Sequence, residues 1–384
     1  MPGWELIDIK GKNELNKIFH ESNGVMFAHG FNERRNNIFR VRDFEKKFTQ
    51  YFKNKYCLAT TSGTMAQYIA MKAMGIGPGD EVITQSFTFV ATVEAILALG
   101  AKPIILDIND TYNLDYKLIE NSISKKTKLI IPVHMLGNQC EMKEIMKIGK
   151  KYKIPVMEDA CEALGAEYFG KKIGTISEVG IFSLDFAKTI TTGEGGLIIS
   201  NNKEIMNYCR EFHDHGHKNN TKLPRGRDTR DIFGLNLRMS ELQAAVGIAQ
   251  LNKLNYIVKK NRINKKNLKN NIAFKEKINF RRIVDDDGDL ADTLIFNFEN
   301  KKNCDFFVKK YNELGYSTKN LPDAIDWHFS GTWKHMIKEK NIKLKWSKSR
   351  DLLTRSVSIP IFVKQNKDQI SKHAEDINKI LRLI

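Results

Sequence analysis

Two residues of this sequence, a lysine and an aspartate, have the types and the setting to do covalent chemistry on a carbonyl compound. Lys188 lies between an apolar segment and the glycine-rich turn 191–196, and Asp159 follows another apolar segment. A lysine amine forms a Schiff base with an aldehyde, and an ionised carboxylate keeps a nearby pyridine nitrogen protonated. The pair therefore predicts a pyridoxal 5'-phosphate site in which Lys188 and Asp159 are the catalytic residues.

The elements that must position these residues alternate between apolar strands and helices. Strands are expected at 56–60, 81–84, 103–106, 128–133, 155–157, 179–182 and 196–199. Helices are expected at 65–74, 91–99 and 142–151. Such an alternation predicts an α/β fold with a mostly parallel central sheet covered by helices. Ligands bind beyond the carboxyl ends of such strands, which is where Ser62, Phe89 and Asp159 fall.

The domain organisation is expected to change about two thirds of the way along the chain. Residues 241–254 have the apolar periodicity of a long helix, and the chain that follows is basic and polar. Two further strands are expected at 279–283 and 293–297. We therefore expect a large cofactor-binding domain over residues 1–255 and a smaller C-terminal α/β domain over residues 256–384.

The composition is that of an ordinary globular protein. The 384 residues are 41% hydrophobic and 28% charged, and no uninterrupted apolar run is long enough to span a bilayer. The first residues lack the basic and then apolar pattern of a secretory signal, so the expected location is the cytoplasm. The five cysteines are scattered and show no C-x-x-C spacing. Reduced thiols are expected, with neither a disulfide framework nor a metal site.

The net charge of +17 raises the question of an anionic macromolecular partner. Nucleic acids and anionic membranes bind basic patches. The densest basic run, 259–266, has the pattern of a polar helix face and carries no aromatic residue for base stacking. We therefore expect a solvated basic surface that helps to collect anionic substrates, with no nucleic-acid or membrane partner. A non-catalytic basic binding protein is the remote alternative.

Several short motifs, taken together and in order, resemble those of one enzyme family. They are Ser62-Gly63-Thr64, 77–83, 88–92, Val133-His134, Glu158-Asp159-Ala160, 191–196 and 234–241. Over nearly its whole length the chain resembles the sugar aminotransferases of the DegT/DnrJ/EryC1/StrS group. The resemblance implies a fold-type I architecture, a pyridoxal 5'-phosphate cofactor, and transamination of a sugar carbonyl with L-glutamate as the donor.

The resemblance also implies contacts to the cofactor. Gly63, Thr64 and Ser183 match positions that hold its phosphate, and the start of a helix suits an anion on physical grounds as well. Phe89 matches the ring that stacks on the pyridine, with a core aromatic as the rival interpretation. Asn236 matches a residue that reaches the phosphate of a neighbouring subunit, which implies a homodimer with a shared active site.

Glu162 departs from the family pattern. Many members have a glutamine at this position, and its amide bonds the 3-oxygen of the cofactor. A carboxylate beside a phenolate oxygen would repel it unless one of the two is protonated. Glu162 is therefore expected either to share a proton with that oxygen as a cofactor contact or to point elsewhere.

The resemblance leaves two possible acceptor sugars. The usual family substrate is a nucleotide-linked 4-keto-6-deoxy sugar. However, residues 1–6, 31–43 and 214–217 resemble a branch that converts 8-oxo-3-deoxy-manno-octulosonate to 8-amino-3,8-dideoxy-manno-octulosonate for lipopolysaccharide biosynthesis. That free sugar acid is the expected acceptor, and a nucleotide-linked sugar is the alternative.

Both a sugar acid and L-glutamate carry carboxylates, for which a guanidinium is a well-matched partner. Arg35 and Arg42 are the candidate partners, with ordinary surface arginines as the rival interpretation. His215, His217 and His328 are candidates for contacts to sugar hydroxyls.

Overall fold

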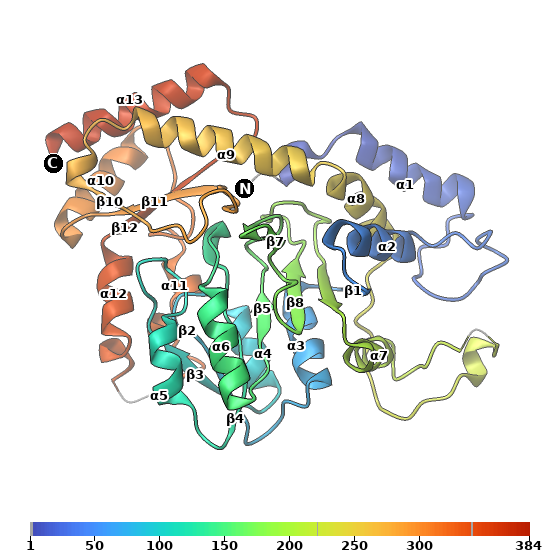
Figure 1. The fold of residues 1–384 in the computed structure, drawn as a ribbon. Coiled ribbons are helices and arrows are strands. Elements are labelled where there is room, and N and C mark those ends of the chain that lie inside the picture. The colour runs from blue at the N-terminus through green and yellow to red at the C-terminus, as the bar shows by residue number, and fades with distance from the viewer. Residues whose placement is uncertain (1–2, 221, 339–340) are drawn as a thin grey trace.

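The computed structural model describes residues 3–220, 222–338 and 341–384. A central sheet is packed between helices, as Figure 1 shows. The N-terminal helices, coloured blue, lie at one edge of the molecule, and the orange and red C-terminal elements lie at the opposite edge. Among the described residues, no helix has the length and apolar character that a membrane crossing requires.

The central sheet combines a four-stranded and a three-stranded set of strands. They are β1 (Tyr56–Thr60), β2 (Glu81–Gln85), β3 (Lys102–Leu106), β4 (Thr127–Ile130), β5 (Met157–Asp159), β8 (Val179–Ser183) and β9 (Gly196–Ser200). Bridges from Ile130 to Val156 and from Val133 to Asp159 join the two sets, which gives the order β3-β2-β4-β5-β8-β9-β1. Among these strands β9 alone runs antiparallel to its neighbours, so the predicted mostly parallel sheet is confirmed.

Helices cover both faces of this sheet because its strands are apolar on both sides. The helices up to the end of this sheet's domain are α1 (Ile9–Glu21), α2 (Arg40–Phe52), α3 (Gly63–Ala73), α4 (Ala91–Ala98), α5 (Ile119–Ser122), α6 (Met142–Tyr152), α7 (Lys203–Phe212) and α8 (Glu241–Leu251). In β1, for example, Leu58 packs in the cluster under α3, α4 and α7, whereas Cys57 and Ala59 pack in the cluster under α2 and α8. A short hairpin joins β6 (Glu167–Tyr168) to β7 (Lys171–Lys172).

The C-terminal elements form a second layer with its own core. An antiparallel sheet of β10 (Asn279–Phe280), β11 (Thr293–Asn297) and β12 (Ser356–Pro360) packs under α9 (Leu254–Asn271), α10 (Lys301–Glu313) and α13 (Lys367–Leu383). The intervening α11 (Ile325–His328) and α12 (Ser347–Thr354) return to the central sheet, where Phe329 and Leu353 join its core. The domain boundary between 255 and 256 stays a prediction.

Most expected elements are present with shifted ends. The strand expected at 155–157 is displaced to Met157–Asp159, so that Asp159 is its last residue. The helix expected at 241–254 ends at Leu251, and a second helix begins at Leu254. No helix was predicted at α1, α2 or α7; α2 and α7 pack against β1 at the edge of the sheet, and α1 packs against α8.

Gly196 is a position at which the fold tolerates no side chain. It begins β9, and a Cβ built there would lie 2.1 Å from the carbonyl oxygen of Ser62, the residue that caps α3. Because both atoms belong to main chain in a buried sheet, we expect Gly196→Ala to destabilise the protein by about 1–3 kcal/mol or more. Urea unfolding measures this loss.

Gly226→Ala is the matched control, since nothing lies within 4 Å of a Cβ built at Gly226. We expect the control to change the free energy of unfolding by less than about 0.5 kcal/mol. Equal losses for the two variants would contradict the proposed close approach of β9 to the start of α3.

Candidate active site

A cavity of about 390 Å³ opens at the carboxyl ends of β5 and β8, beside the first turn of α3. The predicted residues that line it are Gly63, Thr64, Phe89, Asp159, Glu162, Ser183, Lys188 and His328. They come from segments that lie far apart in the sequence, and the fold brings them to one cavity. Their individual roles remain proposals, which the contacts below support.

The carboxylate of Asp159 is held in one orientation by its neighbours. The residue is 2% exposed at the end of β5. Its Oδ2 accepts hydrogen bonds from Gln67 Nε2 at 3.0 Å and from Thr92 Oγ1 at 2.8 Å, and its Oδ1 accepts the N–H of Cys161 at 3.1 Å. A carboxylate fixed in this way at a cavity wall is a suitable partner for a cationic ring nitrogen.

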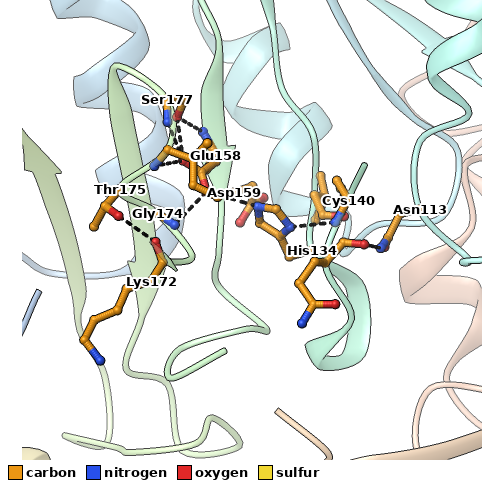
Figure 2. A network of polar contacts seen from close by, with 12 residues as sticks. Asn113, His134, Cys140, Glu158, Asp159, Lys172, Gly174, Thr175 and Ser177 are labelled. Carbon is orange, nitrogen blue, oxygen red and sulfur yellow. Dashed lines mark hydrogen bonds and ion pairs between the residues drawn. The ribbon is translucent and has the colours of Figure 1, made fainter. Parts of the chain in front are cut away.

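A second buried network holds the strand that carries Asp159 (Figure 2). Glu158 accepts main-chain N–H bonds from the turn 174–177 at 2.7 to 2.8 Å. On its other side, Nε2 of His134 lies 3.4 Å from Oε1 of Glu158, and Nδ1 of His134 accepts the N–H of Cys140. Burial alone would raise the pKa of Glu158, but His134 and the N–H donors outweigh burial, and the pKa is lowered.

This network reaches Asp159 through the main chain. The N–H of His134 donates to the carbonyl of Asp159 at 3.0 Å, and the N–H of Asp159 donates to the carbonyl of Pro132 at 3.0 Å. His134 therefore contacts Glu158 through its ring and bonds to Asp159 through its backbone. Glu158 and His134 are positioning residues in this arrangement, because neither lines the cavity.

Lys188 belongs to a buried charged group. Its Nζ lies 3.6 Å from Oε1 of Glu162, and Nε2 of His328 lies 3.8 Å from the same oxygen. Burial opposes the charge on both Glu162 and Lys188, but their mutual attraction prevails. The pKa of Glu162 is therefore lowered, and that of Lys188 is raised. The sequence left open whether Glu162 points toward the cofactor site or elsewhere. The structure places its carboxylate inside the cavity.

The tautomer of His328 follows from its hydrogen bond to the main chain. Nδ1 lies 2.7 Å from the carbonyl oxygen of Ala324, which can only accept, so Nδ1 carries the proton. Burial lowers the pKa of His328, which favours the neutral ring. Nε2 is then an acceptor that faces Glu162, as a contact to a sugar hydroxyl would require.

The start of α3 and the end of β8 form a cradle for an anion. Ser62 caps the helix by accepting the N–H of Met65, and the first N–H groups of a helix have no partner within it. A Cβ at Gly63 would lie 2.8 Å from Cβ of Ser183, so only glycine allows this approach. Thr64 and Ser183 add hydroxyl groups at the same wall. These residues fit a phosphate group.

Main-chain pairing ties the segment around Phe89 to the C-terminal half of the chain. The N–H groups of Thr88 and Val90 donate to the carbonyls of His328 and Trp327 at 3.0 and 2.9 Å. The ring of Phe89 is 39% exposed and packs against the ring of Trp327, with centroids 6.3 Å apart. Phe89 is therefore part of the cavity wall, and the rival interpretation of a core aromatic is wrong.

The N-terminal segment covers the loop that carries the lysine. The N–H of Gly3 donates to the carbonyl of Lys188 at 3.2 Å, and a Cβ at Gly3 would lie 2.4 Å from that oxygen. Trp4 stacks on Phe186 with centroids 6.2 Å apart. These contacts fix the main chain at Lys188 from a segment almost two hundred residues away in sequence.

Five predicted residues lie away from this cavity, four of which keep their predicted roles as open predictions. Asn236, His215 and His217 belong to the loop between α7 and α8, which extends from the body at the right of Figure 1. Asn236 and His215 are exposed, and Nδ1 of His217 lies 3.5 Å from Asp228. Arg42 lines a separate cavity. Their roles stay predictions, and each would need a neighbouring subunit to bring it to an active site.

The substrate role predicted for Arg35 is wrong. Its side chain is fully buried, Nη2 lies 2.7 Å from the Glu241 carboxylate, and its other nitrogens donate to the carbonyls of Phe27 and Ile38. A guanidinium whose donors are used inside the protein has none to offer a ligand. Arg35 instead joins the N-terminal loop to the start of α8.

Gln67, Thr92 and Asn320 were not among the residues predicted for the site. Gln67 and Thr92 bond Asp159, and Asn320 lies 3.5 Å from Glu162. Gln67 lies one helical turn after Ser62-Gly63-Thr64 on α3, which was a usable signal for a side chain on the same face. Asn320 had no local signal, because only the return of the C-terminal chain brings it to the cavity.

This fold and this cavity define a class of protein: an α/β enzyme whose cavity is built to hold an anionic aromatic cofactor against a lysine. A model of the DegT/DnrJ/EryC1/StrS aminotransferase family matches residues 35–378, and the chain belongs to that family.

Relatives and solved structures agree with this assignment. A GDP-perosamine synthase of Caulobacter vibrioides is 40% identical over 226 residues, which cover 58% of this chain and 59% of that protein. A UDP-2-acetamido-2-deoxy-3-oxo-D-glucuronate aminotransferase of Pseudomonas aeruginosa is 39% identical over 213 residues, or 55% of this chain and 57% of that protein. The matched part thus spans less than two thirds of these relatives.

Among solved structures, an aminotransferase from Psychrobacter cryohalolentis has a TM-score of 0.87 at 25% identity and covers 99% of this chain and 98% of its own. NtdA from Bacillus subtilis, solved with bound PMP, has a TM-score of 0.83 at 25% identity over 99% of this chain and 83% of its own. The predicted fold-type I architecture is therefore confirmed.

The network behind Asp159 generates a prediction about stability. Glu158→Gln removes a buried charge that accepts several N–H bonds, so we expect a loss of about 3 kcal/mol at neutral pH. The pKa of Glu158 in the folded protein is lowered from its ordinary value of 4.5. The contribution of the ionised Glu158 to the free energy of unfolding is therefore fully present above pH 4.5 and is lost as the pH falls through the pKa of the folded protein.

Urea unfolding at neutral pH and near pH 4 checks this prediction. The free energy of unfolding of wild type should exceed that of Glu158→Gln by the full amount at neutral pH and by a smaller amount at the lower pH. Glu178→Gln, a change at a nearby exposed carboxylate, is the control and should have little effect at either pH. A difference that does not depend on pH would show that the charge of Glu158 contributes nothing.

Proposed function

We propose that this protein is a pyridoxal 5'-phosphate-dependent aminotransferase that transfers an amino group from L-glutamate to the carbonyl of a nucleotide-linked keto sugar. The observation that carries the proposal is the position of Lys188 and Asp159 in one cavity, together with an anion cradle at Thr64 and Ser183. Family membership and the PMP-bound NtdA support the cofactor.

The chain's own residues would hold the cofactor as follows. Lys188 would bind it covalently through Nζ, and Asp159 would face its ring nitrogen. The first turn of α3, with Thr64 and Ser183, would hold the phosphate, and Phe89 would cover the ring. When bound, pyridoxal phosphate supplies an electron sink for the carbanion that forms at the donor Cα.

Proton transfer falls to Lys188. Its Nζ is the amine that would take the proton from the donor Cα, and it can do so only after losing its own proton. The carboxylate of Glu162 raises the pKa of Lys188 against burial, so Glu162 opposes that loss. Nε2 of His328 lies 3.8 Å from the same carboxylate oxygen and is unprotonated in the neutral ring, so it is a second site at which a proton can be held.

The nucleotide-linked acceptor is favoured over the sugar acid by two observations. The names of both relatives described above contain a nucleotide-linked sugar, and neither contains an octulosonate. In addition, none of the described residues that line the cavity is an arginine, because Arg35 is buried elsewhere and Arg42 lies in a separate cavity. 8-Oxo-3-deoxy-manno-octulosonate is the second candidate, supported by the sequence of residues 1–6 and 31–43.

A homodimer with shared sites is part of the proposal. Asn236 is exposed and lies off the cavity of its own chain, as expected of a residue that serves a neighbouring subunit. A cytoplasmic location also stays a prediction.

The acceptor is tested by separating the two half-reactions. The cofactor-loaded protein is first reacted with L-glutamate, freed of donor, and then mixed with a GDP-linked 4-keto-6-deoxy sugar or with 8-oxo-3-deoxy-manno-octulosonate. The change in cofactor absorbance reports amine transfer. We expect the nucleotide-linked sugar to react and the sugar acid not to; reaction of the sugar acid alone would overturn the choice of acceptor.

Removing the lysine tests the reaction itself. We expect Lys188→Ala to lower turnover by at least about 10³-fold, because the variant loses both the covalent anchor and the base. Lys203→Ala, which changes an exposed lysine at the start of α7, should retain wild-type turnover. Turnover by Lys188→Ala comparable to that of the control would refute the mechanism.

A further inference from the structure

A second cavity, of about 230 Å³, lies at the edge of the sheet beside β1. It shares no lining residue with the active-site cavity. Its walls come from the N-terminal loop, α2, α7 and the loop before α8. The side chains that carry the argument are His29, Arg42, Glu45, Arg210, His213 and Arg238.

Two arginines bring positive charge to this cavity without a carboxylate partner. Arg42 is exposed on α2 and stacks on the ring of Phe39, 3.7 Å from its centroid. Arg210 on α7 donates from Nη2 to the carbonyl of Cys57 at 2.9 Å. Neither lies within ion-pair distance of any Asp or Glu in the part of the chain that the structure describes. The donors of Arg42, and those of Arg210 other than the one bonded to Cys57, are thus left for another acceptor.

The third arginine is already paired. Arg238 contacts the buried Asp214, which also binds Arg225 and lies 3.5 Å from Nε2 of His29. Burial opposes the charge of Asp214, but Arg225 and Arg238 hold its pKa at about 2. Asp214 is therefore ionised, and these arginines neutralise its charge. Asp214 therefore does not offset the charge of Arg42 and Arg210, which instead act on the carboxyl of Glu45 in the same cavity.

Among the remaining titratable groups of the cavity, the two histidines are neutral at neutral pH and Glu45 is partly ionised. Burial lowers the pKa of His29 to about 3 and that of His213 to about 4, so both rings are neutral. Burial raises the pKa of Glu45 to about 7, although this carboxyl accepts the N–H of Ala59. The cavity thus contains guanidinium groups and a carboxyl that is easily protonated. This is a suitable environment for an anion.

We infer that this second cavity binds a small oxyanion, such as a sulfate-like or carboxylate group, on the guanidinium groups of Arg42 and Arg210. The volume favours a small group, since pockets for drug-sized ligands begin at roughly 300 Å³. A neighbouring depression of about 300 Å³ shares His29, Arg42 and Asn219 with the cavity, so the anionic group can belong to a larger molecule. This site goes beyond the proposed aminotransferase activity and does not depend on it.

Calorimetric titration of the full-length, cofactor-loaded protein tests this inference. Sulfate and succinate are the two probes, one tetrahedral and one a carboxylate, at constant ionic strength. We expect at least one of them to bind, and the one that does identifies the type of oxyanion. If neither binds to the wild type, the cavity holds only water and the inference fails.

Charge-removing variants locate the binding. We expect Arg42→Gln and Arg210→Gln each to weaken binding about tenfold, because each removes charge-assisted hydrogen bonds. Arg382→Gln, an exposed arginine at the end of α13, removes the same charge elsewhere and should leave binding unchanged. Since Arg42 is exposed, its variant stays informative if Arg210→Gln fails to fold. Equal weakening by Arg42→Gln and Arg382→Gln would overturn the inference.

A pH series with sulfate, whose charge is constant near neutrality, provides an independent readout. Protonation of Glu45 removes a negative charge from the cavity, so wild-type affinity should rise as the pH falls from 8 to 6. Glu45→Gln should bind sulfate more tightly than wild type at pH 8 and should show no such rise. An identical pH dependence in wild type and Glu45→Gln would exclude Glu45 from the site.

Discussion

The structure depends most on the fixed position of one carboxylate, that of Asp159. Donors from α3, from α4 and from the following main chain hold its two oxygens. Its backbone is paired with the segment after β4, and the preceding Glu158 anchors the strand from the opposite side of the chain. A partner for a ring nitrogen must not move during the reaction, and these contacts supply that rigidity.

The lysine side of the cavity is organised differently. Nζ of Lys188 is placed by electrostatic attraction to Glu162 rather than by a set of hydrogen bonds, and its main chain is held by Gly3 from the N-terminal segment. A side chain that must alternate between a covalent bond and proton transfer has to keep some freedom. In the proposed mechanism, the charge of Glu162 attracts Lys188 in a way that an uncharged glutamine could not.

The sequence was informative where function is encoded locally. The alternation of strands and helices predicted the sheet, and the short motifs at strand ends predicted the residues that meet at the cavity, from Gly63 to Lys188. It was uninformative where a long-range contact decides the outcome. Arg35 was predicted to bind substrate because its partner Glu241 is about two hundred residues away in the sequence. No feature of the sequence around Asn320 indicates that it lies beside Glu162. Helices α1 and α2 were not predicted because no recognised motif lies within them.

The central claim is that Lys188, and no other lysine, carries the cofactor opposite Asp159. Reduction of the cofactor-loaded protein with borohydride, followed by proteolysis and mass mapping, tests it directly. The account predicts that the added mass lies on the peptide containing residue 188. Label on a different lysine, with that peptide unmodified, would contradict it.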